Sequence, residues 1–365
     1  MKQQRWVSIA TAIKGAIRTG ELAAGARIAS EVEMAQQWSV SPMTVHRALA
    51  ELQREGWVVR RRKAGTVVAD RGDAPLAKIG LVFTNLCHRP QGDYVAGIED
   101  GLAGRYSLLA MASNHDAAEE ARCLERAAGE CGAVICYATG YPQNTPLLRE
   151  IAEAMPLVLV DRAPDGIEAD AVMTDNFGSM LLGLRHLRWH GHRRIAYFME
   201  DQAISSARER QAAYEEFMRH DIGASDPREL IRCFPGAMPF EQYYERAEAL
   251  LGGPDPITAL ACQQDMGMAT ALEACVHLGV RVPDEFAILS FNDVDPRLQP
   301  LARSTHRLVQ RPFEMGHMAA RRIELRLRTP DLPVQVVRLV TNFHPAATHR
   351  RAAGGSIESV NFLKE

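Results

Sequence analysis

The sequence predicts a small, mainly helical N-terminal module with a β-hairpin, followed by a larger α/β region built on parallel sheets. Three observations lead to this fold class. Residues 1–70 carry 11 Lys/Arg and 6 Asp/Glu, whereas the remainder carries 31 and 39. Apolar residues recur at helical spacing up to residue 56 and then alternate, and from residue 78 short apolar runs are separated by helical segments. A basic module before an acidic body is expected to meet a polyanion.

The first two predicted helices lie in residues 1–39. The first ends near Gly20 and has one apolar face, formed by Trp6, Ile9, Ile13, Ala16 and Ile17. Ser30 and Glu33 have the spacing of a capping box, so the second helix is expected to start there. It is short and should bury Met34, Ala35 and Trp38.

A third helix is predicted from Ser41, an N-cap residue followed by Pro42 at the first helical position. Its apolar face comprises Val45, Ala48, Leu49 and Leu52. Near its N-terminus the other face presents Ser41, Met43, Thr44, His46 and Arg47. A helix that enters a major groove places such side chains against base edges and phosphates, so this is the candidate reading helix.

After Gly56 the segment WVVRRRKAGTVVAD alternates apolar residues around a Lys63-Ala64-Gly65 turn, which predicts a two-stranded hairpin. Four consecutive cations, Arg60 to Lys63, lie at its tip. Such a run is compatible with a solvated turn. Behind a helix-turn-helix it favours a wing that lies along phosphates.

Residues 3–69, with the pattern IASEVEMAQQWSVSPMTVHRALAELQREGWVVRRRKAGTVV, resemble the GntR family of winged helix-turn-helix regulators. The resemblance implies DNA contacts from the start of the third helix and from the glycine-tipped wing. The residues that match are Ser41, Met43, Thr44, His46, Arg47 and Gly65. Phosphate contacts are expected from Arg27, Arg61, Arg62 and Lys63. Family members usually have arginines at Val32, Pro42 and His46, so a different operator is expected.

Residues 71–77 are polar and contain Pro and Gly, which predicts a linker between a DNA-binding domain, 1–70, and an α/β domain, 78–350. Residues 351–365 are expected to form a loose tail. In the α/β domain, KIGLVFT, YSLLAMAS, GAVICYA and PLVLVD form one group of strands, and RRIAYF, ITALACQ and FAILSF another. Two lobes joined around residues 161–192, with a ligand cleft between them, are expected; one large sheet is the alternative.

The segments GHRRIAYF, SSARERQAAYEEF, LGVRVPDEFAILSFND and LARSTHRLVQRPFEMG resemble the LacI-type effector domain, which is related in fold to periplasmic sugar-binding proteins. The resemblance implies a sugar or related polar metabolite in the cleft, held first of all by Arg210. The matched positions that should line or support the pocket are Asp175, Asp265, Asn292, Asp293 and Gln310. Asp93 and Tyr94 follow the first strand, where the family often contributes a wall, but an ordinary helix start explains them equally well.

The sequence gives little support to several alternative functions. The string His186, His190, His192 has metal-ligand spacing, but solvent-facing histidines before a strand explain it better, so no metal is expected. GntR-like heads also occur on pyridoxal-phosphate enzymes, which need a lysine, and no lysine lies within the core of the large domain. No nucleotide-binding or hydrolase motif is present either, so neither catalysis nor a cofactor is expected. A sugar-binding protein without a DNA-binding role would need an export signal and would not need the basic head.

The resemblances together imply a homodimeric repressor that binds double-stranded operator DNA and releases it on binding a sugar, in the layout of AraR-type arabinose repressors. The seven cysteines show no C-x-x-C spacing, which fits reduced thiols in the cytoplasm. No apolar run approaches the roughly 18–20 residues of a membrane span, so no membrane association is expected.

Overall fold

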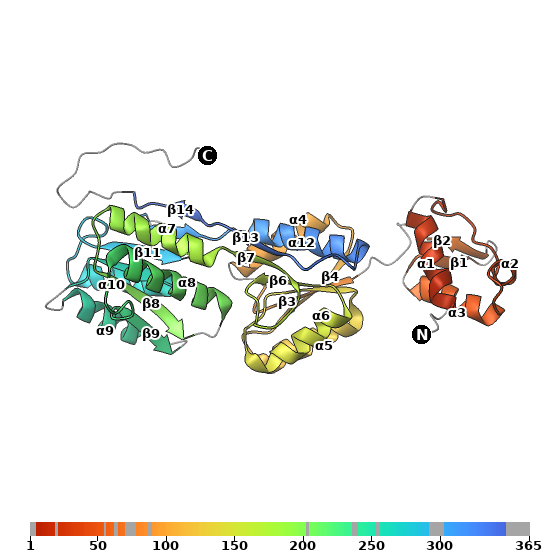
Figure 1. The fold of residues 1–365 in the computed structure, drawn as a ribbon, viewed down its shortest axis with the longest axis horizontal. Helices are drawn as coiled ribbons and strands as arrows, with labels where there is room; N and C mark the ends of the chain where they lie inside the picture. Colours follow the sequence, from red (N-terminus) through yellow and green to blue (C-terminus); the bar gives the residue numbers. More distant parts are fainter. Residues whose placement is uncertain are drawn as a thin grey trace. The chain divides into compact units, whose positions relative to one another are not determined.

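A computed structural model of the chain describes residues 5–18, 21–54, 56–61, 65–69, 78–86, 90–201, 204–235, 240–252, 256–291 and 303–347 (Figure 1). The chain divides into two compact units, one comprising Met1–Ile79 with Gly104–Leu109 and the other the remaining residues. We call residues 5–69 the head and residues 78–347 the body, and each is described by itself.

The head consists of three helices and a hairpin, as predicted. Its elements are α1 (Arg5–Arg18), α2 (Glu31–Gln37), α3 (Pro42–Arg54), β1 (Val58–Arg61) and β2 (Gly65–Val68). The capping box is confirmed, because the Glu33 N–H donates to Ser30 Oγ and the Ser30 N–H donates to Glu33 Oε2. Strands β1 and β2 pair antiparallel. The predicted apolar face of α3 is buried together with Ile9, Ile13 and Met34, so the three helices share one core.

The prediction that Trp38 points inward was wrong. Met34 and Ala35 are buried, but Trp38 is 41% exposed. The reason is the length of α2, which ends at Gln37, so that Trp38 is its C-cap residue. The chain then turns at Ser39, which has a φ of 50°, and the helical face does not continue.

The body contains two six-stranded sheets, so the two-lobed prediction is confirmed and the single-sheet alternative is wrong. The N-lobe sheet has the order β13-β7-β6-β5-β3-β4 and the C-lobe sheet the order β14-β12-β11-β10-β8-β9. The N-lobe strands are β3 (Lys78–Phe83), β4 (Ser107–Ala112), β5 (Ala133–Cys136), β6 (Leu157–Asp161), β7 (Asp170–Thr174) and β13 (Val336–Leu339). The C-lobe strands are β8 (Ile195–Asp201), β9 (Ile231–Pro235), β10 (Ala259–Cys262), β11 (Ala287–Phe291), β12 (His306–Val309) and β14 (Asn342–His344).

The strands pair mainly in parallel, as expected for buried apolar runs separated by helices. Parallel registers join β5 to β6, β6 to β7 and β7 to β13 in the N-lobe. In the C-lobe they join β9, β8, β10, β11 and β12 in turn, while β14 pairs antiparallel with β12. The carboxyl ends of parallel strands meet at one edge of a sheet, which is where polar side chains from several strands gather.

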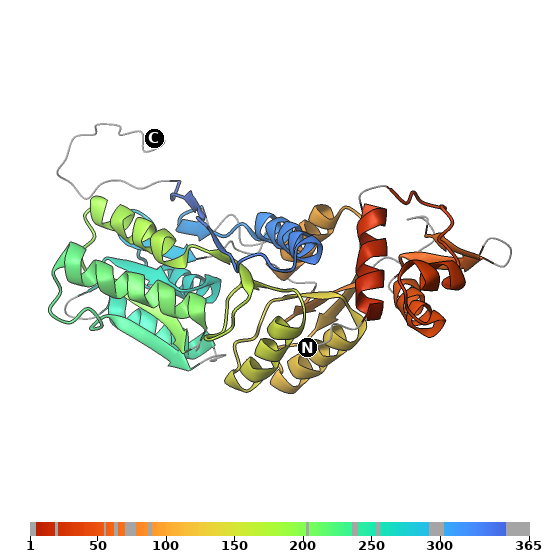
Figure 2. The same ribbon diagram turned by 45° about the vertical axis from the view of Figure 1, so that its right-hand side comes forward.

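Helices cover both faces of each sheet (Figures 1 and 2). In the N-lobe, α4 (Gln91–Leu102) and α12 (Pro312–Arg328) lie on one face, and η1 (Pro142–Asn144), α5 (Ala117–Glu130) and α6 (Thr145–Ala154) on the other. In the C-lobe, α7 (Asn176–Trp189), α8 (Ser205–Glu216) and η2 (Phe217–Ile222) share one hydrophobic cluster. The helices α9 (Phe240–Leu251) and α10 (Asp265–His277) share the other. The two clusters take alternate residues of the central strands, as a buried sheet requires.

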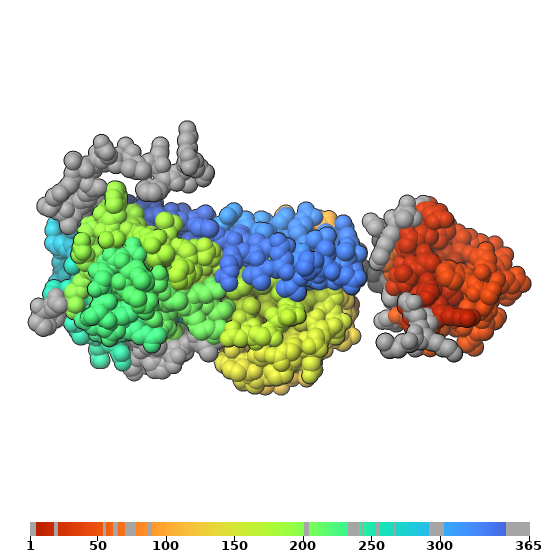
Figure 3. All heavy atoms as spheres, in the orientation of Figure 1, coloured from red at the N-terminus to blue at the C-terminus, as the bar shows by residue number. Residues whose placement is uncertain are grey.

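The chain passes between the lobes at three places. The first is from β7 to α7 at Asp175, the second from β12 to α12 at Gln310, and the third from β13 to β14 at Val340. Helix α12 thus returns to the N-lobe sheet, and Figure 3 shows it in blue on the same upper side of the body as α7. Any change in the angle between the lobes must be absorbed at these three short segments.

Helices α4 and α12 pack unusually closely, because glycines stand where they cross. A Cβ added at Gly97 would lie 1.9 Å from the Phe313 carbonyl oxygen, and one at Gly316 would lie 2.1 Å from the Tyr94 carbonyl oxygen. Both distances are far below a van der Waals contact, so only glycine fits at either position. The crossing joins the start of α12, next to Gln310, to the first turn of α4, which contains Tyr94.

Candidate nucleic-acid interface and interlobe site

The first turn of α3 holds three of the predicted DNA-contacting residues. Ser41 caps the helix: its Oγ accepts from the Thr44 N–H at 3.3 Å and lies 2.9 Å from Thr44 Oγ1. Met43 is 73% exposed. The two hydroxyls and the methionine therefore stand at the helix N-terminus, where partial positive charge favours a phosphate.

Arg47 and Arg27 are two exposed cations of the head. The Arg47 guanidinium carbon lies 4.7 Å from the centroid of the Trp6 ring, a cation–π contact that orients the side chain without neutralising its charge. Arg27 belongs to the segment before α2 and forms a β-bridge with Val67, which fixes its backbone against the hairpin.

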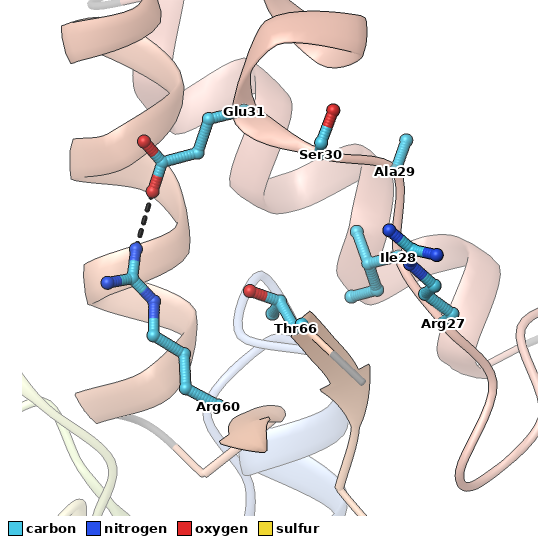
Figure 4. A pocket seen from close by; sticks show the side chains of 8 residues that line it. Arg27, Ile28, Ala29, Ser30, Glu31, Arg60 and Thr66 are labelled. Carbon is cyan, nitrogen blue, oxygen red and sulfur yellow. Dashed lines mark hydrogen bonds and ion pairs between the residues drawn. The ribbon is translucent and has the colours of Figure 1, made fainter. Parts of the chain in front are cut away.

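The sequence did not predict that Glu31 joins the third helix to the wing. Glu31 Oε1 accepts from Arg60 Nη2 at 2.5 Å (Figure 4). The same oxygen lies 3.0 Å from His46 Nδ1. We call Glu31, His46 and Arg60 the Glu31 cluster; it links α2, α3 and β1. One of the four predicted wing cations is thereby paired within the head itself.

A hollow of about 480 Å³ lies between the start of α2 and the hairpin (Figure 4). Its walls are Arg27, Ile28, Ala29, Ser30, Glu31, Arg60, Gly65 and Thr66. Gly65 has a φ of +75°, a left-handed conformation that favours glycine at the turn of the wing. The side chain of Arg61, and Arg62 and Lys63 entirely, lie outside the described residues.

Arg210 is the centre of the interlobe site. It projects from α8, is only 6% exposed, and donates from Nε to Asn176 Oδ1 at 2.9 Å and from Nη1 to the Gln263 carbonyl at 2.7 Å. Its guanidinium carbon lies 3.6 Å from the centroid of the Phe291 ring. Burial lowers the pKa of Arg210, whereas the charge of Asp161 acts to raise it. A buried, fixed guanidinium retains Nη2 as a further donor for an anionic or hydroxylated group.

Asp161 is the main acidic group of the site on the N-lobe side. Its Oδ1 accepts from Gln310 Nε2 at 3.0 Å and from the Tyr94 hydroxyl at 3.2 Å, and Arg162 pairs with its Oδ2 at 3.0 Å. Burial by itself raises the pKa of Asp161, but Arg162 and then Arg210 outweigh it and hold the pKa below its ordinary value. The group is therefore a carboxylate at neutral pH. Its φ of 68° marks a tight turn at the end of β6.

Gln310 connects the site to two of the three interlobe segments. Besides Asp161, its amide donates to Thr174 Oγ1 at 2.7 Å, immediately before the first segment. Thr174 Oγ1 and the Tyr94 hydroxyl both lie near Met315 Sδ, at 3.6 and 3.7 Å. Hydrogen bonds thus join Asp161, through Gln310, to Thr174 and to two of the segments that connect the lobes.

Direct contacts also cross between the lobes beside this site. The Ala163 N–H donates to Ser205 Oγ at 3.2 Å, and Arg208 pairs with Asp165 at 2.9 Å. The start of α8 therefore contacts the loop after β6. Arg338 of β13 pairs with Glu209 at 2.9 Å on the same helix. The lobes touch in this conformation through residues that flank Arg210.

The other predicted residues of the body occupy varied places. Tyr94 is fully buried and Asp93 half-buried, both in the first turn of α4. Asp175 is the N-cap of α7, where its Oδ1 accepts from the Gly178 N–H at 2.9 Å. Asp265 is exposed at the first position of α10, after β10. Asn292 and Asp293 lie outside the described residues.

Sequence reasoning missed several residues of the interlobe site, among them Asp161, Arg162, Asn176 and Gln263. A signal was present for Asp161, because it ends the apolar run PLVLVD, and an acidic residue after a buried strand falls at the carboxyl edge of the sheet. Gln263 follows the run ALAC in the same way. Asn176 carried no comparable signal, since its role depends on the distant Arg210.

The lowered pKa of Asp161 predicts that the stability of the folded chain depends on pH. An aspartate whose folded-state pKa is lowered contributes stability above its unfolded value, about 3.9, and this contribution is lost as the pH falls through the folded value. Asp161→Asn should therefore be less stable than the native chain at pH 6, and the difference should shrink below about pH 4. Urea unfolding of both proteins at pH 6 and pH 3 measures it; a difference that is the same at both pH values would contradict this role.

Two family models match separate parts of the chain. Residues 7–68 match the model of bacterial regulatory proteins of the gntR family, and residues 184–348 match a periplasmic binding protein-like domain. The chain joins a GntR-type DNA-binding domain to a periplasmic-binding-protein-like domain. It is therefore a DNA-binding transcription regulator with a ligand-responsive domain, which confirms the prediction from the sequence.

The chain is also similar to other transcription regulators. An arabinose metabolism transcriptional repressor of Geobacillus stearothermophilus is 27% identical over 289 residues, which are 76% of this chain and 79% of that protein. Among solved structures, the transcription regulator CcpA of Lactococcus lactis has a TM-score of 0.65 at 20% identity, covering 75% of this chain and 99% of that one. The complex of the transcriptional regulator CelR with cellobiose has a TM-score of 0.63 at 21% identity, covering 84% and 90%. These two structures establish the likeness of fold.

Two further findings concern the described residues of the regulator. No helix among them is long and apolar enough to cross a membrane. Within the same ranges, no group of three or more His, Cys, Asp or Glu side chains has an arrangement that would hold a metal ion. His186, His190 and His306 do pack together, with the His186 ring centroid 4.5 Å from that of His190 and 4.8 Å from that of His306.

Proposed function

We propose that this regulator is a homodimeric, cytoplasmic repressor of carbohydrate-utilisation genes, which releases its operator when a sugar binds at the interlobe site. The observation that carries the proposal is the position of Arg210. It projects from the C-lobe, is fixed by Asn176 and Gln263, and lies close enough to the Asp161 of the N-lobe for the two charges to shift each other's pKa. A ligand held by both groups joins the lobes.

The chemistry of these two groups suits a sugar. Vicinal hydroxyls both donate and accept, so they need a carboxylate and a fork of N–H donors together. Arg210 supplies donors, Asp161 supplies acceptors when the ligand displaces one of its present donors, Gln310, Tyr94 or Arg162, and the Tyr137 ring, stacked at 5.8 Å from Phe83, adds an apolar surface. A related repressor is named for arabinose metabolism, and a similar structure holds cellobiose. Asp93, Tyr94, Asp175, Asp265, Asn292, Asp293 and Gln310 complete the proposed ligand site.

In the head, the start of α3 makes the base contacts, and the wing and its neighbours make the phosphate contacts. Two heads of a dimer read the half-sites of a palindromic operator. The residues assigned to DNA are Arg27, Ser41, Met43, Thr44, His46, Arg47, Arg61, Arg62, Lys63 and Gly65. The sugar closes the lobes, which changes the spacing of the heads, so sugar and operator weaken each other's binding by the same factor.

We also propose an organisation for the chain. The DNA-binding domain comprises residues 1–70, the linker 71–77, the ligand-binding domain 78–350 and a tail 351–365; the linker and the tail lie outside the described residues. The protein acts by binding alone, without an enzymatic activity or a cofactor, on double-stranded DNA and a small molecule.

Selection from a random DNA library with the full chain tests the DNA-binding half of the proposal. The expected product is a pseudo-palindrome whose half-sites are contacted by the start of α3. Replacing Arg61 and Arg62 together with alanine should weaken binding to all sequences alike, because two phosphate contacts are lost. The slope of log affinity against log salt should become shallower by about 1.8, from roughly 0.9 per phosphate. An unchanged slope would contradict the wing assignment.

A further inference from the structure

In the Glu31 cluster, Glu31 joins His46 of the third helix to Arg60 of the wing. His46 occupies a position where members of the GntR family usually have an arginine. His46 Nδ1 lies 3.0 Å from Glu31 Oε1, and the same oxygen accepts from Arg60 Nη2. We propose that Glu31 fixes the tautomer of His46 and thereby selects the kind of base edge that the third helix reads. This inference rests on the proposed function, since it assumes that α3 enters the major groove.

The tautomer follows from the acceptor chemistry of the carboxylate. An ionised carboxylate accepts hydrogen bonds and donates none, so the proton between the two groups belongs to His46 Nδ1. In a neutral imidazole only one nitrogen carries a proton, which leaves Nε2 as an acceptor. Arg60 holds the carboxylate in place, because its guanidinium donates to the same oxygen from the wing side (Figure 4).

The remaining nitrogen is available to DNA. The His46 side chain is 48% exposed although Nδ1 faces Glu31, and Nε2 lies on the opposite edge of the ring. His46 is at the fifth position of α3, one turn from the helix start. The side chain is therefore placed where a reading helix contacts base edges.

An acceptor at this place selects bases differently from an arginine. In the major groove, adenine presents the N6 amino donor and cytosine the N4 amino donor, whereas guanine presents only the N7 and O6 acceptors. An arginine matches guanine. His46 with an acceptor Nε2 matches adenine or cytosine and is repelled by guanine. Glu31 thus acts as a positioning residue for specificity without touching DNA.

The tautomer is tested without DNA by two-bond ¹H–¹⁵N correlation spectra of the histidine-labelled full chain at pH 8.0, with His46→Asn identifying the signal. The expected result is a proton on Nδ1 in the native chain and a mixture of both tautomers in Glu31→Gln, because an amide both donates and accepts. Glu33→Gln is the matched control: it lies on the same helix and its hydrogen bonds are those of the capping box with Ser30, not those that join the cluster, so it should retain the native signal. A proton on Nε2 in the native chain, or no change in Glu31→Gln, would overturn the inference.

The consequence for specificity is tested with operator duplexes that carry each of the four bases at every half-site position. At one position the native chain should prefer adenine or cytosine over guanine by roughly tenfold, the size of one directed base contact. In Glu31→Gln this preference should fall below about threefold, while Glu33→Gln keeps it. A native preference for guanine at the His46-dependent position, or a preference that Glu31→Gln leaves intact, refutes the inference although DNA binding itself stands. Failure of the native chain to bind any duplex instead refutes the proposed function, which the tautomer spectra do not test.

Discussion

Replacing Arg210 with alanine is expected to abolish the response to the sugar while leaving operator binding in place. The guanidinium supplies the donors of the interlobe site and donates hydrogen bonds to the Asn176 side chain and the Gln263 carbonyl. Its removal leaves two buried acceptors without their donor, at a cost of about 1–3 kcal/mol each in the stability of the body. The ligand loses its main donor at the same time. We therefore expect no release of operator at sugar concentrations that are saturating for the native chain.

Two further variants distinguish a loss of ligand binding from a loss of stability in the body. Arg208→Ala, two residues earlier on α8, removes a half-exposed arginine that pairs with Asp165, and should change the sugar response by no more than a few fold. Arg210→Lys keeps the positive charge but loses the planar fork and the stacking on Phe291, so it should fail nearly as completely as alanine. Equilibrium titrations of labelled operator with and without sugar measure all three. A full response in Arg210→Ala would show that the ligand is held elsewhere.

Replacing Gly97 with alanine should be among the most destabilising single changes in the body. The new Cβ would lie 1.9 Å from the Phe313 carbonyl oxygen and 2.9 Å from the His317 nitrogen, both backbone atoms of α12. Backbone atoms cannot rotate away, so α4 and α12 must separate. We expect a loss of about 3–5 kcal/mol, at the upper end of overpacking effects, and a fall in Tm on the order of 10 °C.

A matched glycine provides the control for this prediction. Gly129 is also within a helix, α5, but a Cβ there would meet no atom within 4 Å. Gly129→Ala should therefore stabilise the protein by about 0.5–1 kcal/mol, through the higher helix propensity of alanine. Thermal unfolding of the two variants is the measurement. Equal Tm values for Gly97→Ala and Gly129→Ala would mean that the α4–α12 crossing is looser than the structure shows.

Local sequence signals predicted the head almost completely. The capping box at Ser30, the Ser41-Pro42 start and the alternation around the hairpin are each short-range patterns, and each formed as expected. The prediction that Trp38 is buried was wrong, because apolar periodicity indicates which face of a helix a residue shares but not the residue at which the helix ends. Here α2 has seven residues and ends at Gln37. The Glu31 cluster was missed because its members are 15 and 29 residues apart, and only the fold brings them together.

The body was predictable in its strands but only partly in its site. Buried apolar runs identified seven of its strands, since a strand inside a sheet needs apolar residues on both faces. Arg210 was predicted through the resemblance, but its hydrogen-bond partners were not. Asn176 lies at the start of α7, after the first interlobe segment, and Gln263 lies directly after the end of β10. The role of Gln310 in lining or supporting the pocket stays a prediction, whereas its bonds to Asp161 and Thr174 depend on how three crossing segments meet. Such convergence is a property of the tertiary fold, which no local pattern records.

We propose that one chain binds operator DNA through its head and releases it when a sugar binds between the lobes of its body. The most direct measurement is the affinity of the full chain for its selected operator in the presence of a panel of pentoses, hexoses and their phosphates. We expect one member to weaken operator binding by at least tenfold in the native chain and not in Arg210→Ala. The same compound should raise the Tm of the native chain without DNA. Operator binding that no compound of the panel changes, together with an unchanged Tm, would contradict it.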